Sequence, residues 1–298
     1  MSSVAKALER LRVAEGNSLA LDAFSPSDTC GLSTSKKEAQ QQLHEEWLAR
    51  LPGLQERLWA DDRWAVLLIF QGMDASGKDG VIKHVMSGVN PQGCQVTSFK
   101  VPSEEELDHD YLWRTTRALP ERGRIGIFNR SYYEEVLVVR VHSGVLARQK
   151  LPPRLVGPDL WRQRFEDIAA FERYLARNGT VVVKFFLHVS REEQRRRFLE
   201  RLETPEKRWK FSLGDVVERR HWDRYMAAYE DMIRHTAAPH APWYVVPADH
   251  KWFARLVVAA AVVRTLEGLD LKFPALDEAH LADLEEARRQ LAAEGAGE

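Results

Sequence analysis

Residues 65–80 read AVLLIFQGMDASGKDG, an uninterrupted apolar run that leads directly into a glycine-rich loop. The loop has the GxxxxGK pattern of a P-loop, with glycines at Gly72 and Gly77 and a lysine at Lys78. Glycines let backbone N–H groups turn toward an anion, and the N-terminus of the following helix adds partial positive charge. A glycine-rich turn that only links a strand to a helix is the competing interpretation, and the strand–loop–helix context favours a phosphate site. We expect Gly72, Ser76, Gly77 and Lys78 to bind phosphate.

Two carboxylates make this loop unusual. Asp79 stands where most P-loops place a Ser or Thr hydroxyl on magnesium, and Asp74 lies inside the loop. Carboxylates beside bound phosphates are repulsive unless a divalent cation lies between them. The sequence therefore predicts Mg²⁺ as a cofactor, with Asp74 and Asp79 as metal ligands, although Asp79 could instead cap the helix.

Four further apolar, β-branched or aromatic runs follow, each succeeded by helix-like sequence: VTSF (96–99), IGIF (125–128), VVVKFFLHV (181–189) and WYVV (243–246). Such alternation predicts an α/β fold with a parallel five-stranded sheet and helices on both faces. Strands buried on both sides should be continuously apolar, and only VTSF is not. We expect that strand at an edge.

The chain divides into three predicted parts: an N-terminal arm and helix (1–60), a main domain (61–272) and a C-terminal helix or tail (273–298). Within the first part, apolar residues at helical spacing predict one face of a helix that Pro52 and Gly53 could break in two. These residues are Leu43, Trp47, Leu51, Leu54 and Leu58.

The third predicted strand ends in Asn129 and Arg130, at the sheet edge where ligands bind in open α/β folds. This position usually presents an Asp to the metal, and Asn129 offers only a neutral carbonyl. We expect Asn129 to join Asp74 and Asp79 as a metal ligand through that oxygen. The Arg130 guanidinium can bind phosphate oxygens in a bidentate manner, or it can pair with Glu134 one turn later.

A strongly basic segment follows the fourth strand, and we expect it to form a helical lid at about residues 190–220. Arg197 and Arg201 fall at i and i+4 and share a helical face, as an arginine-lined lid over phosphoryl groups requires. A solvated helix with mixed charge is the competing interpretation. Arg191 and Arg195 form a second pair at i and i+4, and we expect Arg195 to bind phosphate as well. Lys83 and Lys100 are weaker phosphate-binding candidates.

Composition sets limits on the function. The 43 basic and 44 acidic residues give a net charge of −1, which argues against nucleic-acid binding over a broad surface. Two cysteines indicate neither a disulfide framework nor a zinc site and favour a reducing compartment. We see neither a signal peptide nor a membrane span, and we expect a cytoplasmic protein.

Five stretches together resemble the family-2 polyphosphate kinases, over roughly residues 25–270. These stretches are GMDASGKDG (72–80), GVNPQGCQVTSFK (88–100), ELDHDYLWR (106–114), FNRSYYEEVLVVRVH (128–142) and APWYVV (241–246). The resemblance implies a P-loop kinase fold similar to thymidylate kinase and a reversible, Mg²⁺-dependent transfer of phosphate between inorganic polyphosphate and ADP, AMP or ATP. It also suggests a homo-oligomer, with guanine nucleotides as further candidate substrates.

The resemblance also implies roles for individual residues. Lys78 is similar to the Walker A lysine, Asp74 to the metal-binding loop carboxylate and Arg130 to the Walker B arginine, and we assign these three as catalytic. Arg197 and Arg201 resemble the lid arginines, and Asn129 departs from members that carry Asp. Two alternatives are an ATP-dependent nucleoside monophosphate kinase and a non-enzymatic nucleotide-binding switch.

Overall fold

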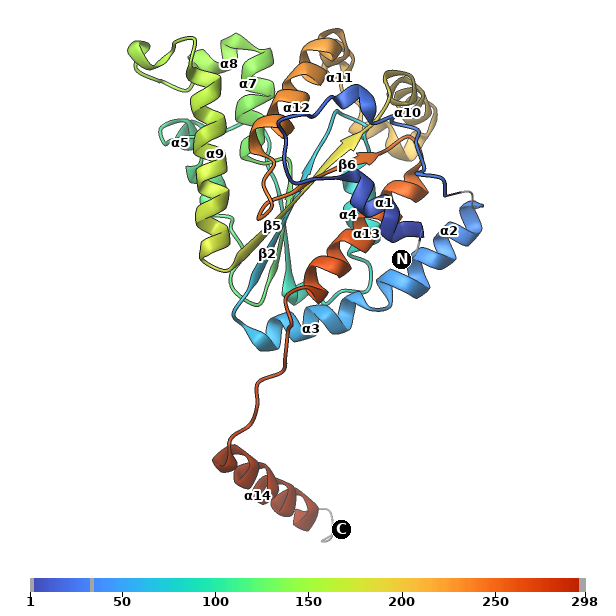
Figure 1. The fold of residues 1–298 in the computed structure, drawn as a ribbon, viewed down its shortest axis with the longest axis vertical. Coiled ribbons are helices and arrows are strands. Elements are labelled where there is room, and N and C mark those ends of the chain that lie inside the picture. Colours follow the sequence, from blue (N-terminus) through green and yellow to red (C-terminus); the bar gives the residue numbers. More distant parts are fainter. Residues whose placement is uncertain (1–2, 33–34, 295–298) are drawn as a thin grey trace.

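A central β-sheet organises the chain (Figure 1). The structure is a computed structural model that describes residues 3–32 and 35–294. Its strands are β1 (Arg12–Val13), β2 (Ala65–Gln71), β3 (Cys94–Ser98), β4 (Ile125–Asn129), β5 (Thr180–His188) and β6 (Trp243–Pro247). Within the described residues these form a six-stranded sheet in the order β1-β6-β5-β2-β4-β3.

All five predicted strands are present, and they pair with one another in parallel as expected: β2 lies between β4 and β5, β3 pairs with β4, and β6 pairs with β5. The more polar strand, β3, lies at an edge as expected. The prediction of five strands was wrong by one, because β1 pairs antiparallel with β6 at the opposite edge. A strand of two residues contains no hydrophobic run that could reveal it.

Helices cover both faces of the sheet (Figure 1). One layer contains α1 (Ser3–Leu11), α3 (Leu51–Asp61), α4 (Lys78–Val85) and α13 (Lys251–Glu267), which contact one another through α13. The other contains α7 (Val138–Val141), α9 (Leu160–Arg177) and α12 (Trp222–Thr236). Because α13 is covered on nearly all sides, its sequence is apolar around most of its circumference.

The predicted helix before β2 is interrupted in two places. It consists of α2 (Lys36–Gln42), a π-helical turn η2 (Leu43–Leu48) and α3. The five apolar positions predicted to form its inner face are all buried. Pro52 lies in the first turn of α3, where its missing N–H leaves no helical hydrogen bond unmade.

Short elements connect these layers. They are η1 (Leu21–Ala23), η3 (Pro91–Gly93), α5 (Glu104–Leu107), α6 (Trp113–Thr116), η4 (Tyr132–Val136), α8 (Ser143–Ala147) and η5 (Pro153–Leu155). None of the helices among the described residues is both long enough and apolar enough to cross a bilayer.

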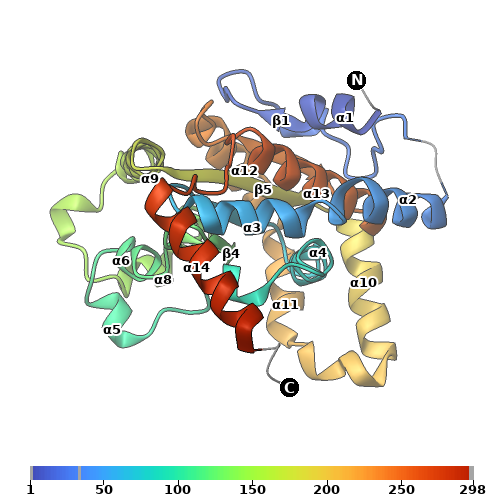
Figure 2. The same ribbon diagram turned by 90° about the horizontal axis from the view of Figure 1, so that it is seen from below.

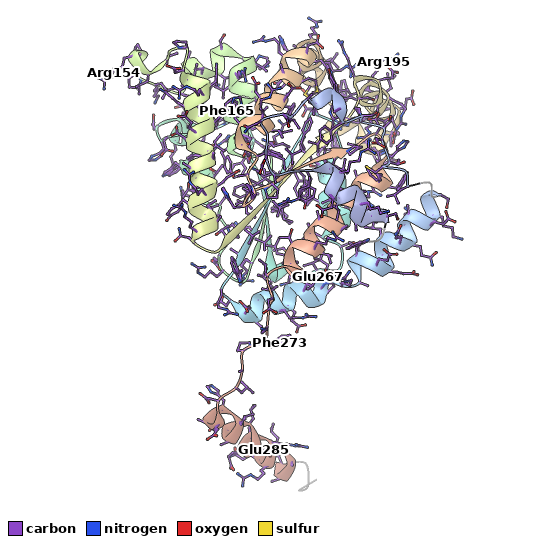
Figure 3. All side chains as sticks on the ribbon, in the orientation of Figure 1. Arg154, Phe165, Arg195, Glu267, Phe273 and Glu285 are labelled. Carbon is purple, nitrogen blue, oxygen red and sulfur yellow. The ribbon has the colours of Figure 1, made fainter. Side chains whose placement is uncertain are left out.

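Two segments leave the body of the molecule. Figure 2 shows α10 (Arg191–Glu203) and α11 (Leu213–Glu218) as two arms joined at their far end by η6 (Pro205–Lys210), and η7 (Arg219–His221) leads back toward α12. Helix α14 (Glu278–Glu294) stands apart with no buried residue (Figure 3). The division into three parts stays a prediction, and residues 1, 2, 33, 34 and 295–298 of its terminal parts lie outside the described residues.

A buried ion pair joins the sheet to α9. Lys184 in β5 is fully buried and donates to Glu172 at 2.5 Å and to the Thr236 carbonyl at 2.8 Å. Tyr132 and Tyr133 donate to the other oxygen of Glu172 at 2.8 and 2.7 Å. Because both charges are paired and hydrogen-bonded, the sheet tolerates a lysine inside an otherwise apolar strand.

His188 at the end of β5 makes stability depend on pH. Its ring is buried, and burial lowers its pKa from 6.5 to about 4 against the opposing effect of Asp249 and Asp22. As pH falls from 6.5 toward 4, this ring therefore becomes protonated in the unfolded chain but stays neutral in the folded protein. We expect the unfolding free energy to drop by about 2 kcal/mol between pH 7 and pH 5 through this group alone. Urea unfolding at both pH values measures the drop. Between these pH values the unfolding free energy of His188→Gln should fall by about 2 kcal/mol less than that of the unmodified protein. An equal fall in both proteins would contradict the role given to His188.

Candidate active site

The loop between β2 and α4 has the backbone that its glycines predict. Gly72 has φ +150° and Gly77 has φ +107°, both in the region that favours glycine. A Cβ on Gly72 would lie 2.8 Å from the Leu187 carbonyl oxygen, so a larger residue does not fit there. The loop therefore passes close over the ends of β2 and β5 and turns directly into α4.

Lys78, the first residue of α4, folds back over this loop. Its Nζ donates to the carbonyl oxygens of Gly72 at 2.6 Å and Met73 at 3.2 Å. Burial lowers the pKa of Lys78 to about 8, with a smaller contribution from the positive charge of Arg130. A bound anion would relieve this cost, because it would supply the compensating charge that the buried ammonium lacks.

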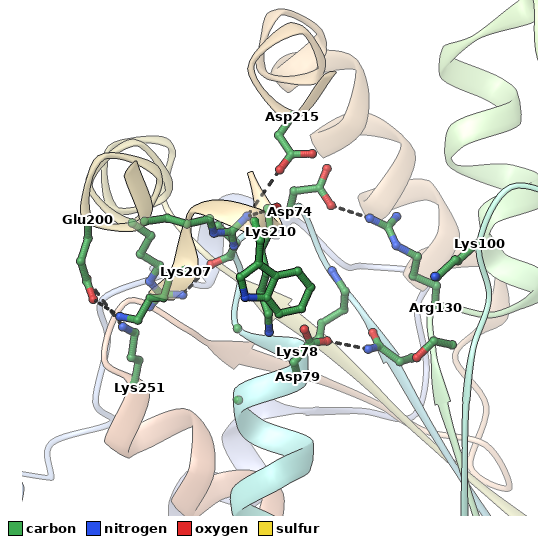
Figure 4. A pocket seen from close by; sticks show the side chains of 18 of the residues that line it. Asp74, Lys78, Asp79, Lys100, Arg130, Glu200, Lys207, Lys210, Asp215 and Lys251 are labelled. Carbon is green, nitrogen blue, oxygen red and sulfur yellow. Dashed lines mark hydrogen bonds and ion pairs between the residues drawn. The ribbon is translucent and has the colours of Figure 1, made fainter. Parts of the chain in front are cut away.

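A cavity of about 930 Å³ opens above the loop at the carboxyl ends of the strands (Figure 4). Its basic side chains come from six different parts of the chain, and they are Lys78, Lys100, Arg130, Arg197, Arg201, Lys207, Lys210 and Lys251. Acidic side chains are interspersed, and they are Asp74, Asp79, Glu200, Glu206 and Asp215. This lining suits an extended polyanion accompanied by cations.

Arg130 links the loop to the end of β4. Its Nη1 donates to Glu134 at 3.2 Å, the side-chain partner considered from the sequence, and its Nη2 donates to Asp74 at 2.5 Å, a partner that the sequence did not suggest. The two carboxylates, Glu134 first, raise the pKa of Arg130 above its usual value. Arg130 has φ +64°, which a non-glycine residue rarely adopts, and its N–H is held by the Phe70 carbonyl at 3.0 Å. The strained backbone aims the guanidinium across the cavity (Figure 4).

Asp79 and Asn129 meet on the other side of the loop. The Asn129 amide donates to Asp79 at 2.7 Å, so the two predicted metal ligands are neighbours, and Asp74 lines the same cavity. Carboxylate and amide oxygens are the hard donors that Mg²⁺ prefers. No group of three or more His, Cys, Asp or Glu side chains among the described residues could enclose a metal by itself. Such an open donor set suits an ion that also binds water and substrate phosphates.

Two arginines of helix α10, Arg197 and Arg201, reach the cavity in different ways. Arg197 is buried and donates to the carbonyl oxygens of Ala75 (3.0 Å), Ser76 (2.7 Å) and Asp249 (3.2 Å), and it also bonds Glu193 and Ala248. Its guanidinium thus lines the cavity and at the same time holds the loop through the Ala75 and Ser76 carbonyls, a role that the sequence did not suggest. Arg201 lines the cavity and lies 3.5 Å from Asp215.

Four predicted phosphate-binding residues do not line the cavity, and they are Gly72 and Ser76 in the loop, Lys83 on α4 and Arg195 on α10. Arg195 points into solvent (Figure 3) and pairs with Glu192 at 3.1 Å. It lies two residues before Arg197, which places it on the opposite side of α10. Lys83 is exposed and lies five residues after Lys78, on a different face of α4. Lys100, by contrast, does line the cavity.

The sequence reasoning missed one cavity lysine altogether. Lys251 is the first residue of α13 and lies 4.0 Å from Glu200, beside Lys207 in Figure 4. It follows the carboxyl end of β6, so the rule that located Arg130 after β4 could also have found it. Lys207 and Lys210 belonged to the predicted basic segment without a role of their own.

A second cavity of about 510 Å³ adjoins the first and shares Asp74, Phe99, Lys100 and Arg130 with it. Most of its remaining surface is apolar and comes from Val101, Pro102, Leu107, Val138, Val139, Val145 and Tyr225, with the polar groups of Arg114, Glu134, Glu135, Arg148, Gln149 and Glu218 among them. A charged cavity and an apolar cavity therefore meet at one point, beside Asp74 and Arg130.

The fold and these cavities have the features expected of a P-loop protein, with a charged cavity that suits phosphates beside a cavity that suits a more apolar group. The profile of the polyphosphate kinase 2 (PPK2) family matches residues 33–274, and the chain belongs to this family. An ADP-polyphosphate phosphotransferase of Rhodopseudomonas palustris is 51% identical over 284 residues, covering 95% of this chain and 98% of that protein.

Two further relatives agree with this assignment. An AMP/ADP-polyphosphate phosphotransferase of Meiothermus ruber is 46% identical, covering 90% of this chain and 96% of its own. The crystal structure of polyphosphate kinase 2 from Arthrobacter aurescens TC1 superposes with a TM-score of 0.85 at 38% identity, over 98% of this chain and 97% of the other.

Proposed function

We propose that the protein transfers phosphoryl groups between inorganic polyphosphate and adenine nucleotides, with ADP, AMP or both as acceptors. The observation that carries the proposal is the meeting of a cation-lined cavity and a largely apolar cavity at Asp74 and Arg130. The first cavity suits a phosphate chain, and the second suits a nucleoside. Family membership and the names of the two relatives support the same activity.

In this proposal the protein mainly aligns reactants and neutralises charge. Lys78, Arg201 and the loop N–H groups hold the terminal phosphates of the chain, and Arg130 with Lys100 holds the acceptor phosphate. An acceptor oxygen attacks the terminal phosphorus in line, the bond to the bridging oxygen breaks, and a polyphosphate shortened by one unit leaves. The attacking phosphate oxygen is already anionic at neutral pH, so no side chain has to remove a proton from it.

Mg²⁺ is part of the proposal. Asp74, Asp79 and Asn129 supply the oxygen donors that would hold it, and when bound it would neutralise charge on the transferring phosphates. Reversibility, guanine nucleotides as substrates, a homo-oligomer, a cytoplasmic location and a thymidylate-kinase-like arrangement of the sheet are further parts of the proposal.

The two rival functions make different demands on the first cavity. An ATP-dependent nucleoside monophosphate kinase would place a second nucleoside there, where most side chains are charged. A nucleotide-binding switch would not need basic residues from α10, η6 and α13 gathered on the donor side. Both features favour a donor made of phosphates alone.

The test combines purified protein, magnesium and long-chain polyphosphate with either ADP or AMP, and follows nucleotides by chromatography. ATP from ADP, or ADP and ATP from AMP, is the expected product. Transfer from ATP to a monophosphate without any product from polyphosphate would replace the proposal with the monophosphate kinase function. Nucleotide binding without turnover would favour the switch.

A further inference from the structure

A cluster of buried charges lies behind the second cavity. It consists of Glu135 on η4, Arg114 on α6, Arg164 on α9 and Gln149 after α8, and we call these four residues the Glu135 cluster. Glu135, Arg114 and Arg164 are only 2%, 9% and 3% exposed. Burial raises the pKa of Glu135, while the Gln149 amide and the two arginines act to lower it.

The members of the Glu135 cluster hold one another in fixed orientations. Arg164 donates to the Glu135 carbonyl at 2.8 Å and to the Gln149 side chain at 2.6 Å, and Gln149 in turn donates to the Glu135 carboxylate. The carboxylate lies 3.6 Å from Arg164 and 3.7 Å from Arg114. Glu106 on α5 lies 3.7 Å from Arg114 and supplies the second negative charge.

The Glu135 cluster separates two cavities. Arg114, Glu135 and Gln149 line the second cavity and also a third cavity of about 210 Å³ behind it, in which Arg164 and Tyr111 take part. Buried charges cost more free energy than apolar residues of the same volume would. Because these charged residues lie between two cavities, where apolar residues would pack at a lower cost, we expect a function of the cluster beyond packing.

The same cluster ties together three walls of the second cavity. Arg114 donates to the Lys100 carbonyl at 2.8 Å and lies over the Phe99 ring, which fixes the turn after β3. Glu135 follows Glu134, the partner of Arg130. Gln149 anchors the segment after α8, close in sequence to Val145. Displacing one member would thus move the walls relative to one another and to Arg130.

We propose that the Glu135 cluster is the positioning element of the acceptor pocket: it sets the shape of the second cavity for a nucleoside mono- or diphosphate without touching the phosphate donor. The inference rests on the proposed function, because it takes the second cavity as the acceptor site. None of the four side chains lines the first cavity. Their loss should therefore affect the two substrates unequally.

The test is Glu135→Gln, which keeps the size of the side chain but leaves two arginines facing a neutral group. We expect KM for the acceptor nucleotide to rise about tenfold or more, while KM for polyphosphate changes less than about twofold. Calorimetric titration of ADP into the protein without polyphosphate should show the same loss of affinity.

Glu172→Gln is the matched control, since Glu172 is equally buried, lies on α9 with Arg164 and pairs with Lys184 away from all three cavities. It should lower thermal stability and leave both KM values unchanged. If Glu135→Gln behaves like Glu172→Gln, the cluster is only structural and the inference fails. If the unmodified protein makes no nucleotide product from polyphosphate, the proposed function itself fails.

Discussion

Replacing Lys78 with alanine is expected to lower kcat with polyphosphate and ADP by roughly a hundredfold or more, with the fold retained. The ammonium lies at the start of α4 and bonds the carbonyls of Gly72 and Met73, so it both supports the loop and offers its charge to a phosphate. Removing one positioned charge from a transition state costs about 3 kcal/mol, which corresponds to this loss in rate. Initial rates at saturating substrate, with circular dichroism and a melting curve, give the measurement.

Lys83→Ala is the matched control for this prediction. Lys83 is on the same helix and carries the same charge, but its side chain is exposed and does not line the cavity. It should retain the rate of the unmodified protein. A Lys78→Ala protein with an unchanged rate, or equal losses in both variants, would refute the role given to Lys78.

The sheet was largely predictable because its strands are buried on both faces. All seven residues of β2 are buried, and such a strand is expected to be a largely continuous apolar run, as residues 65–70 are. The polar residues of VTSF indicated an edge for the same reason, since an edge strand is covered less completely. Strand β1 could not be predicted, because two residues are too few to show a hydrophobic pattern. Its pairing with β6 depends on where α1 packs against α13.

The site was predictable where function lies in a local motif. The spacing of Gly72, Gly77 and Lys78 is a local pattern from which the loop can be predicted without its tertiary contacts, and β4 places Arg130 beside this loop. The sequence also predicted that Arg197 and Arg201 share a helical face, because their spacing along the helix determines this. The spacing does not determine which other residues that face contacts.

Tertiary contacts decide the remaining roles. Arg197 meets the carbonyls of Ala75 and Ser76 because α10 packs against the back of the loop, and only the folded chain brings those groups together. The Glu135 cluster likewise joins residues from four elements, and each of them alone resembles an ordinary charged residue in the sequence.

Arg197→Lys should therefore impair both stability and turnover. Lysine keeps the charge but lacks the planar fork that reaches Ala75, Ser76 and Asp249 together. Leaving these buried carbonyls without donors should cost roughly 3 kcal/mol of unfolding free energy. A loop displaced by about 1 Å should lower kcat by about a hundredfold.

Two neighbours on α10 distinguish this support role from direct phosphate binding. Arg195→Lys should leave the unfolding free energy, kcat and KM for polyphosphate unchanged, since Arg195 is exposed and faces away from the loop. Arg201→Lys should raise KM for polyphosphate with little effect on stability, because Arg201 lines the cavity. If Arg197→Lys instead raises KM for polyphosphate and melts like the unmodified protein, then Arg197 contacts the phosphate chain, as its sequence position first suggested. Urea unfolding and initial rates on the three variants separate the two roles, because only a residue that holds the loop changes stability and kcat together.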